Sequence, residues 1–289
     1  MSDAFKEFEV AGWREPVRAD AYDAVGITAG TSLLDVATAT GHVAGAASAR
    51  GVRAVGVDVS EEMLARARRL YPGVEFALGD AEELAFVDDT FDAAVAAFLL
   101  HHVPSPERVV AELARVASRV AVTQWDAGER ARLIGLLTDA IAAAGVKPPT
   151  GRPVGPSREQ LARDEELRRL LANAELADIR VDTLAFVEPM RSTDELWSGV
   201  LDGSVNTRAT VLAQPPDVRK RIRDELERLI EPHRHDGKST CPFPCASRRV
   251  GVASRRRGVD AARRERSEDE PFGGSTAGRN SADLSRRHT

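Results

Sequence analysis

A loop of small residues lies between two acidic side chains near the start of the chain. The loop is Ala37-Thr38-Ala39-Thr40-Gly41, Asp35 precedes it, and Asp58 follows 17 residues beyond Gly41. Small residues let a backbone approach a ligand closely, and a helix that starts after such a loop offers unpaired N–H groups. An acidic residue placed like Asp58 can accept hydrogen bonds from the hydroxyls of a ribose. The pattern predicts a nucleoside-binding site.

The residues around this loop discriminate between nucleoside cofactors. The dinucleotide fingerprint has three glycines as G-x-G-x-x-G, whereas this loop has only Gly41. Asp35 would also place an anion close to the pyrophosphate of NAD. S-adenosylmethionine carries an ammonium and a sulfonium, and both are favoured near a carboxylate. The residues therefore favour S-adenosylmethionine, with an NAD-dependent oxidoreductase and an ordinary Ala/Thr-rich turn as the alternatives.

Alternating strands and helices are needed to position these residues. Short apolar runs predict strands, and amphipathic segments between them predict helices. Five strands alternating with helices over about 100 residues imply a parallel sheet covered on both faces. The expected strands are 32–36, 53–57, 74–78, 91–98 and 119–124, and the expected helices are 43–50, 61–70 and 106–117.

The rest of the chain divides into three further regions. Residues 1–28 are expected to form a helical lid before the nucleoside-binding core at 29–127. Residues 128–235 are expected to hold helical insertions and a sixth strand at 179–187, on the acceptor side. The segment 236–289 is rich in Arg, Ser and Gly, which is typical of a largely disordered tail; a short strand is possible at 249–253.

Charge and composition exclude several classes of protein. Residues 1–236 carry 28 basic and 39 acidic side chains, whereas 237–289 carry 12 and 6. An acidic body disfavours a nucleic-acid partner, because phosphate binding needs a basic surface. No run approaches the roughly 18 apolar residues of a membrane span, and the polar N-terminus does not resemble a secretory signal. We therefore expect a cytoplasmic protein that acts on a small molecule; its oligomeric state is not predicted.

Five segments, in order along the chain, resemble the motifs of class I S-adenosylmethionine-dependent methyltransferases. They are 32–44, 55–64, 76–86, 89–92 and 98–103, within a match of roughly residues 30–125. The most similar subgroup contains the ubiquinone and menaquinone biosynthesis methyltransferases and many small-molecule methyltransferases. The resemblance implies a Rossmann-like α/β fold and transfer of a methyl group from S-adenosylmethionine to O, C or N of a small acceptor. A protein that binds the cofactor without methyl transfer is a further alternative.

The resemblance also implies a role for each matching position. Asp35 would orient the loop and the methionine ammonium, and Asp58 would hold the ribose hydroxyls. Asp80 and the backbone of Ala81 would contact the adenine edge. The other implied cofactor-binding positions are Ala37, Ala39 and Gly41 beside the methionine part, Val59 and Met63 beside the adenine, and Phe98 beside the methionine part or the acceptor. The family usually has glycine where Ala37 and Ala39 stand, and this departure puts full catalytic competence in doubt.

The acceptor side has less specific signals. His101 and His102 follow the fourth strand, and a histidine that titrates near neutrality suits a general base; a packed or solvent-facing histidine is the alternative. Methyl transfer from a sulfonium is a direct displacement that alignment and desolvation alone could promote. The aromatic residues expected at the acceptor pocket are Trp13, Tyr22 and Trp125, and weaker candidates are Gln124 and Asp126.

No metal site is expected. His233, His235, Cys241 and Cys245 lie within 13 positions of one another. Their H-x-H and C-x₃-C spacings differ from those of common zinc fingers.

Overall fold

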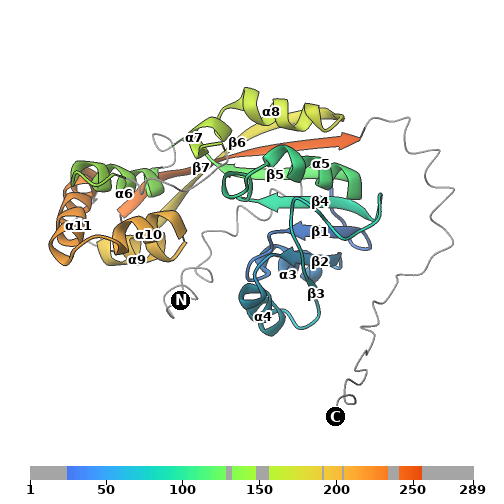
Figure 1. Cartoon of the computed structure of the whole chain (residues 1–289), viewed down its shortest axis with the longest axis horizontal. Coiled ribbons are helices and arrows are strands. Elements are labelled where there is room, and N and C mark those ends of the chain that lie inside the picture. Colours follow the sequence, from blue (N-terminus) through green and yellow to red (C-terminus); the bar gives the residue numbers. More distant parts are fainter. Residues whose placement is uncertain are drawn as a thin grey trace, which may run out of the picture. The chain divides into compact units, whose positions relative to one another are not determined.

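A computed structural model describes residues 25–127, 132–147, 156–190, 192–203, 205–233 and 241–255 of the chain. These residues form a seven-stranded sheet in the order β3-β2-β1-β4-β5-β7-β6 (Figure 1). Its strands are β1 (Ser32–Val36), β2 (Arg53–Asp58), β3 (Glu75–Leu78), β4 (Phe91–Ala97), β5 (Ala117–Trp125), β6 (Leu176–Met190) and β7 (Cys241–Arg255). The expected α/β class with a mainly parallel sheet is confirmed.

The strand order reverses at β1. Strands β1 to β5 are parallel, and β1 lies between β2 and β4, with Asp35 opposite Gly56 on one side and Val95 on the other. The chain moves outward from β1 to β3 and then returns to β4 on the other side of β1. In parallel α/β sheets, ligands bind at the carboxyl ends of the strands where the order reverses in this way. Asp35 and Asp58 lie at those ends.

Helices cover both faces of the sheet. On one face, α3 (His42–Ala49) and α4 (Glu61–Leu70) pack their alanines and Leu64 on Leu33 and Val95. On the other, α5 (Pro106–Val116) and α8 (Asp164–Asn173) pack on Leu34 and Val122. A short helix, α7 (Arg158–Leu161), precedes α8. Since both faces are buried, the strands are nearly continuous apolar runs.

Two helix starts show how local sequence positions the site. Gly41 precedes α3 with φ of 81°, a region that side chains disfavour, and a Cβ there would lie 2.6 Å from the ring of Phe76. Glycine is therefore needed at this position. Ser60 caps α4 through its hydroxyl, which accepts a hydrogen bond from the Met63 amide, and Glu61 in the first turn favours the helix dipole.

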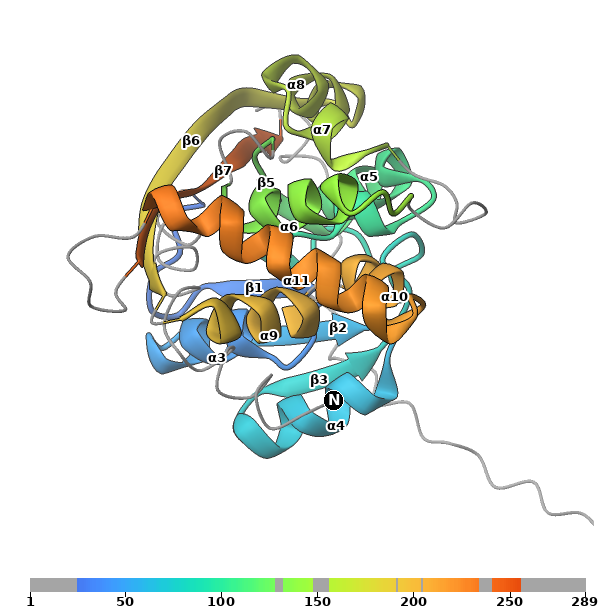
Figure 2. The ribbon, with the colours of Figure 1, turned by 90° about the vertical axis from the view of Figure 1, so that its left-hand side faces the viewer.

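A second apolar cluster lies beyond the carboxyl end of β5. It joins four helices to Trp125, with Phe98 and Trp197 packed against it. The four helices lie side by side in Figure 2. They are α6 (Arg132–Ala143), α9 (Thr193–Gly203), α10 (Val205–Leu212) and α11 (Pro216–Ile230), and a single turn, η2 (Glu231–His233), follows α11.

The last two strands complete the sheet and are longer than expected. β7 is antiparallel to both β5 and β6, and the short strand expected at 249–253 is the C-terminal part of this 15-residue strand. Ala253 is buried, and Gly251 lies close to Leu171 and Val122 of neighbouring elements. The ends of β1 and α4 are the expected ones, and those of the other expected strands and helices of the core differ by one or two residues. Backbone pairing, which the apolar pattern does not show, sets these ends.

Candidate cofactor and acceptor site

The loop after β1 is held by hydrogen bonds to both acidic residues. The buried Asp35 accepts hydrogen bonds at Oδ2 from the Thr38 hydroxyl at 2.5 Å and from the Ala44 amide at 3.1 Å. The Thr38 amide donates to the Val57 carbonyl at 2.9 Å, and the Ala39 amide donates to Asp58 Oδ2 at 2.9 Å. Asp35, the loop and Asp58 are thus brought together as expected. Thr38 is a residue that the sequence reasoning missed, since nothing in the sequence distinguishes it from Thr40.

The backbone at both loop alanines has positive φ. Ala37 has φ of 58° and Ala39 has φ of 50°. An L-residue with a Cβ is disfavoured in this region by roughly 1–2 kcal/mol, whereas glycine is not. The structure therefore gives the physical reason why glycine suits these positions, and it shows that the alanines keep the conformation.

Burial changes the acidity of Asp35. Desolvation raises its pKa to about 7, against the hydrogen bonds from Thr38 and Ala44, and the nearby Asp58 adds to the increase. A cation bound next to Asp35 would favour the charged carboxylate and lower the pKa again. The site is therefore suited to a positively charged group.

Asp58 has remaining capacity for a ligand. Its Oδ1 accepts a hydrogen bond from the Ser60 amide at 2.9 Å, while Oδ2 accepts from Ala39. An ionised carboxylate has about four lone pairs, so each oxygen can accept a further hydrogen bond. Next to it, Val59 is 77% exposed and Met63 is partly buried at the start of α4. The adenine role of both residues stays a prediction.

The loop between β3 and β4 brings Asp80 to the same edge. The Gly79 amide donates to the Asp58 carbonyl at 3.0 Å, which joins this loop to the end of β2. Asp80 is exposed, and its Oδ1 accepts a hydrogen bond from the Glu82 amide at 2.9 Å in a tight turn. Ala81 lies within this turn and is partly buried. Asp80 therefore has a turn-forming role, and its other carboxylate oxygen has no partner among the described residues.

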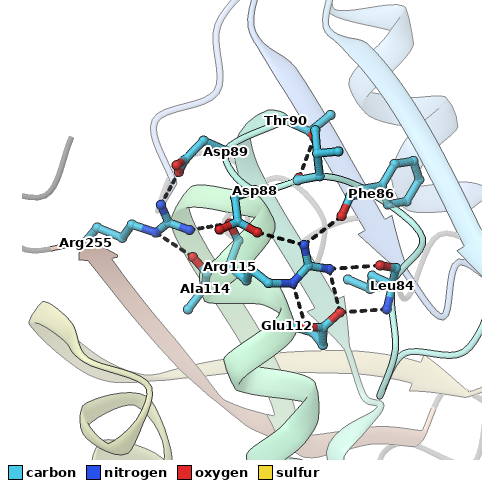
Figure 3. Close-up of polar contacts among 10 residues, drawn as sticks. Leu84, Phe86, Asp88, Asp89, Thr90, Glu112, Ala114, Arg115 and Arg255 are labelled. Atoms are coloured by element: carbon cyan, nitrogen blue, oxygen red, sulfur yellow. Dashed lines mark hydrogen bonds and ion pairs between the residues drawn. The ribbon is translucent and has the colours of Figure 1, made fainter. Parts of the chain in front are cut away.

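Helix α5 anchors the rest of that loop. Arg115 donates from Nη1 to the Phe86 carbonyl at 2.7 Å and from Nη2 to the Leu84 carbonyl at 2.9 Å (Figure 3). Glu112 accepts hydrogen bonds from Arg115 and from the Leu84 amide, and the bonds from Arg115 are the main reason why its pKa lies below the usual range. Arg255 of β7 forms an ion pair with Asp89 of the loop and donates to the Ala114 carbonyl of α5 at 2.5 Å. The loop is therefore fixed by side chains from two other elements.

The acceptor candidates lie just past β4 and at the carboxyl end of β5. Phe98, with φ of 57°, stacks on Trp125 at 4.6 Å between ring centroids. His101 lies in the short helix η1 (Leu100–His102), and its Nδ1 is within 3.0 Å of the side-chain amide of the buried Gln124. His102 lies beside His101, with 3.8 Å between ring centroids. The fold thus groups these side chains at the carboxyl ends of adjacent strands.

Other candidates cannot be placed. Trp13 and Tyr22 lie outside the described residues, as does His235, and so do the side chains of Cys241 and Cys245. Asp126 is buried after β5, where its Oδ1 accepts a hydrogen bond from the Ala127 amide.

A different cavity lies at the opposite ends of the strands. It has a volume of about 480 Å³ and is lined by Val25, Arg119, Arg180 and the last residues of β7. Arg119 is near the start of β5, whereas the loop and the acidic residues lie at the carboxyl ends of β1 and β2. This cavity is therefore not part of the candidate site.

The sheet order, with acidic residues at the carboxyl ends of β1 and β2, is that of a Rossmann-like fold of the class I methyltransferase type. Residues 34–120 match a family described as a methyltransferase domain. The chain also resembles solved structures across most of its length. The YcgJ protein of Bacillus subtilis aligns with a TM-score of 0.55 and 20% identity, over 84% of this chain and 99% of that one. The MccD protein aligns with a TM-score of 0.52 and 15% identity, over 84% of this chain and 97% of that one.

Curated relatives match the same region. Phosphatidylethanolamine N-methyltransferase of Cereibacter sphaeroides is 47% identical over 96 residues, which is 31% of this chain and 47% of that protein. Demethylmenaquinone methyltransferase of Renibacterium salmoninarum is 36% identical over 115 residues, 40% of this chain and 47% of that protein. Ubiquinone biosynthesis O-methyltransferase of Hahella chejuensis is 35% identical over 120 residues, which is 40% of this chain and 50% of that protein.

These matches all fall on the core of the chain. Residues 34–120 match the methyltransferase-domain family, and this part of the chain is similar to menaquinone and ubiquinone methyltransferases. The matched segment spans about half the length of these curated relatives or less. None of the helices in the described part of the chain has the length and apolarity that a bilayer crossing needs.

Proposed function

We propose that the chain transfers a methyl group from S-adenosylmethionine to O, C or N of a small-molecule acceptor and releases S-adenosylhomocysteine. The observation that supports this most is the joining of Asp58 and the Asp35 loop at one edge of the sheet. The cofactor supplies a methyl group on a positively charged sulfur.

The residues present fit this cofactor. Asp58 keeps acceptor capacity for the ribose hydroxyls, and the buried Asp35 favours the methionine ammonium. Gly41 allows the close approach of the loop to Phe76 and to Ala67 of α4. Asp80 and the amide of Ala81 would contact the adenine edge, between Val59 and Met63. Phe98 would lie beside the methionine part or the acceptor.

The acceptor would bind beyond β4 and β5. Trp125 and Phe98 offer an apolar aromatic surface there, and the helices that pack against them would close the site from water. His101 could take a proton from an acceptor hydroxyl or amine, with Gln124 fixing its ring. The rest of the acceleration would come from aligning the acceptor with the sulfonium methyl.

Calorimetry with S-adenosylhomocysteine tests the cofactor assignment. We expect 1:1 binding, no binding of NAD, and a loss of about tenfold or more in affinity for Asp58→Ala, since hydrogen bonds to a charged group are removed. Asp92→Ala is the matched control, because this exposed carboxylate holds Ser32 at the other end of the sheet. No binding by the wild-type protein, or an unchanged affinity of Asp58→Ala, contradicts the assignment.

The strained loop favours one second possibility, namely cofactor binding without methyl transfer. Ala37 and Ala39 have positive φ and carry two methyl groups at positions where the family usually has glycine. Incubation with S-adenosylmethionine carrying a labelled methyl group and a panel of phenols, amines and enols distinguishes methyl transfer from cofactor binding alone. Label transfer to any acceptor supports the methyltransferase, and binding with no transfer across the panel supports the alternative.

A further inference from the structure

Glu82 joins two parts of the site that are distant in sequence. It lies in the loop after β3, and its side chain is only 14% exposed. Its Oε1 accepts a hydrogen bond from the Ser105 amide at 2.9 Å. Arg108 makes two contacts with Glu82. Its Nη2 donates a hydrogen bond to the Glu82 carbonyl at 3.4 Å, and its Nη1 forms an ion pair with Oε2 at 3.8 Å. The adenine-side loop is therefore attached to the start of α5.

The contact replaces a standard helix cap. Ser105 is the N-cap residue of α5, and its side chain makes no capping hydrogen bond. In a capping box, a Glu or Gln at the third helical position accepts the hydrogen bond from the N-cap amide. That position holds Arg108 here, and the carboxylate comes from Glu82 instead. A carboxylate is also favoured there by the helix dipole.

Each end of this contact leads directly to a candidate site residue. On one side, the Glu82 amide donates to Asp80 Oδ1 at 2.9 Å, so that Glu82 forms part of the turn that presents Asp80. On the other side, Ser105 follows η1 by three residues, and η1 contains His101 and His102. The only covalent route between these parts runs through β4.

We propose that Glu82 is a positioning residue that couples the adenine-binding turn at Asp80 to the acceptor-side turn at His101 and His102. This inference rests on the proposed function, because it takes Asp80 to contact the cofactor. Glu82 fixes the turn so that Asp80 is ordered before the adenine arrives. The same carboxylate fixes the N-terminus of α5, and with it the histidines. Occupation of the adenine site then stabilises the acceptor side.

Calorimetry with S-adenosylhomocysteine measures the first half of the proposal. Glu82→Ala should weaken binding by about tenfold, which matches the loss of one hydrogen bond to a charged group. Glu82→Gln keeps an acceptor for the Ser105 amide and should stay within about threefold of the wild type. Glu83→Ala is the matched control, because Glu83 is exposed and its side chain has no partner among the described residues. It should bind as the wild type does.

A double-mutant cycle separates positioning from a general loss of stability. In an Asp80→Ala background, Glu82→Ala should change the affinity by less than about twofold, because the contact that it positions is already absent. Additive effects of the two substitutions would overturn the proposal, as would wild-type affinity in Glu82→Ala. Failure of the wild-type protein to bind S-adenosylhomocysteine at all would instead contradict the proposed function.

Histidine NMR measures the second half. In the wild type, S-adenosylhomocysteine should shift the Cε1–Hε1 signals of His101 and His102, and Glu82→Ala at saturating ligand should lose most of this shift. Glu82→Gln should retain it. Equal shifts in the wild type and in Glu82→Ala would show that the two turns are not coupled through Glu82.

Discussion

The amide of Ala39 donates a 2.9 Å hydrogen bond to Oδ2 of Asp58, and this contact ties the loop after β1 to the end of β2. Ala39 makes it with a backbone φ of 50°, and Ala37 has φ of 58° two residues before. The loop thus keeps the conformation that glycine would adopt without strain. Asp58 and the buried Asp35 hold it in place.

Glycine at either alanine position should stabilise the ligand-free protein. Relief of the left-handed strain outweighs the greater freedom of glycine in the unfolded chain, which costs about 0.4–1 kcal/mol. We expect Ala37→Gly and Ala39→Gly each to raise the free energy of unfolding by about 0.5–1 kcal/mol. Urea denaturation, monitored by circular dichroism, measures this.

A helical alanine provides the control for these substitutions. Ala65 lies within α4, where glycine should lower the free energy of unfolding by about 1 kcal/mol. We expect glycine to raise the free energy of unfolding at the two loop positions and to lower it at Ala65. Destabilisation by Ala37→Gly and Ala39→Gly as large as that by Ala65→Gly would show that the loop alanines carry no strain.

Asp35 should make ligand affinity depend on pH. Its pKa of about 7 in the ligand-free protein means that much of it is protonated below neutrality. The methionine ammonium prefers the carboxylate, so the affinity for S-adenosylhomocysteine should increase as the pH rises from 5.5 to 8. Calorimetry in two buffers of different ionisation enthalpy should detect proton release on binding near pH 6. Asp35→Asn should bind more weakly and remove the dependence.

The same group gives a pH dependence of stability with a definite sign. Between its ordinary pKa of 3.8 and about 7, the folded protein keeps a proton on Asp35 that the unfolded chain has released. The contribution of Asp35 to the free energy of unfolding therefore falls as the pH rises through this range and is constant above it. Asp35→Asn should lack this contribution. Identical slopes in the two proteins would contradict the raised pKa.

Gln124 should control the protonation of His101. The amide of Gln124 lies 2.9–3.0 Å from His101 Nδ1 and is buried. Gln124→Glu would place a carboxylate there and favour the charged imidazolium, so the pKa of His101 should rise. NMR titration of the histidine Cε1–Hε1 signals measures this, with His42 on α3 as the internal control. An unchanged His101 titration in Gln124→Glu would show that the two side chains do not interact in solution.

The sequence by itself determined the order of the elements and predicted that Asp35, the loop after it and Asp58 lie together. The apolar runs at 32–36 and 53–57 and the helix at 61–70 are present within a residue of the expected ends, because buried parallel strands and capped helices have strong local signals. Asp35, Gly41 and Asp58 were found in the same way, since their spacing follows from one strand–loop–helix–strand unit.

Only the tertiary structure decided which distant side chains meet. The positive φ of Ala37 and Ala39, the burial that raises the pKa of Asp35, and the contact between Glu82 and Ser105 depend on packing across strands and helices. The full length of β7 also depends on its pairing with β5 and β6. Local patterns record which face a residue occupies, whereas desolvation and hydrogen bonding between loops depend on partners far away in the chain.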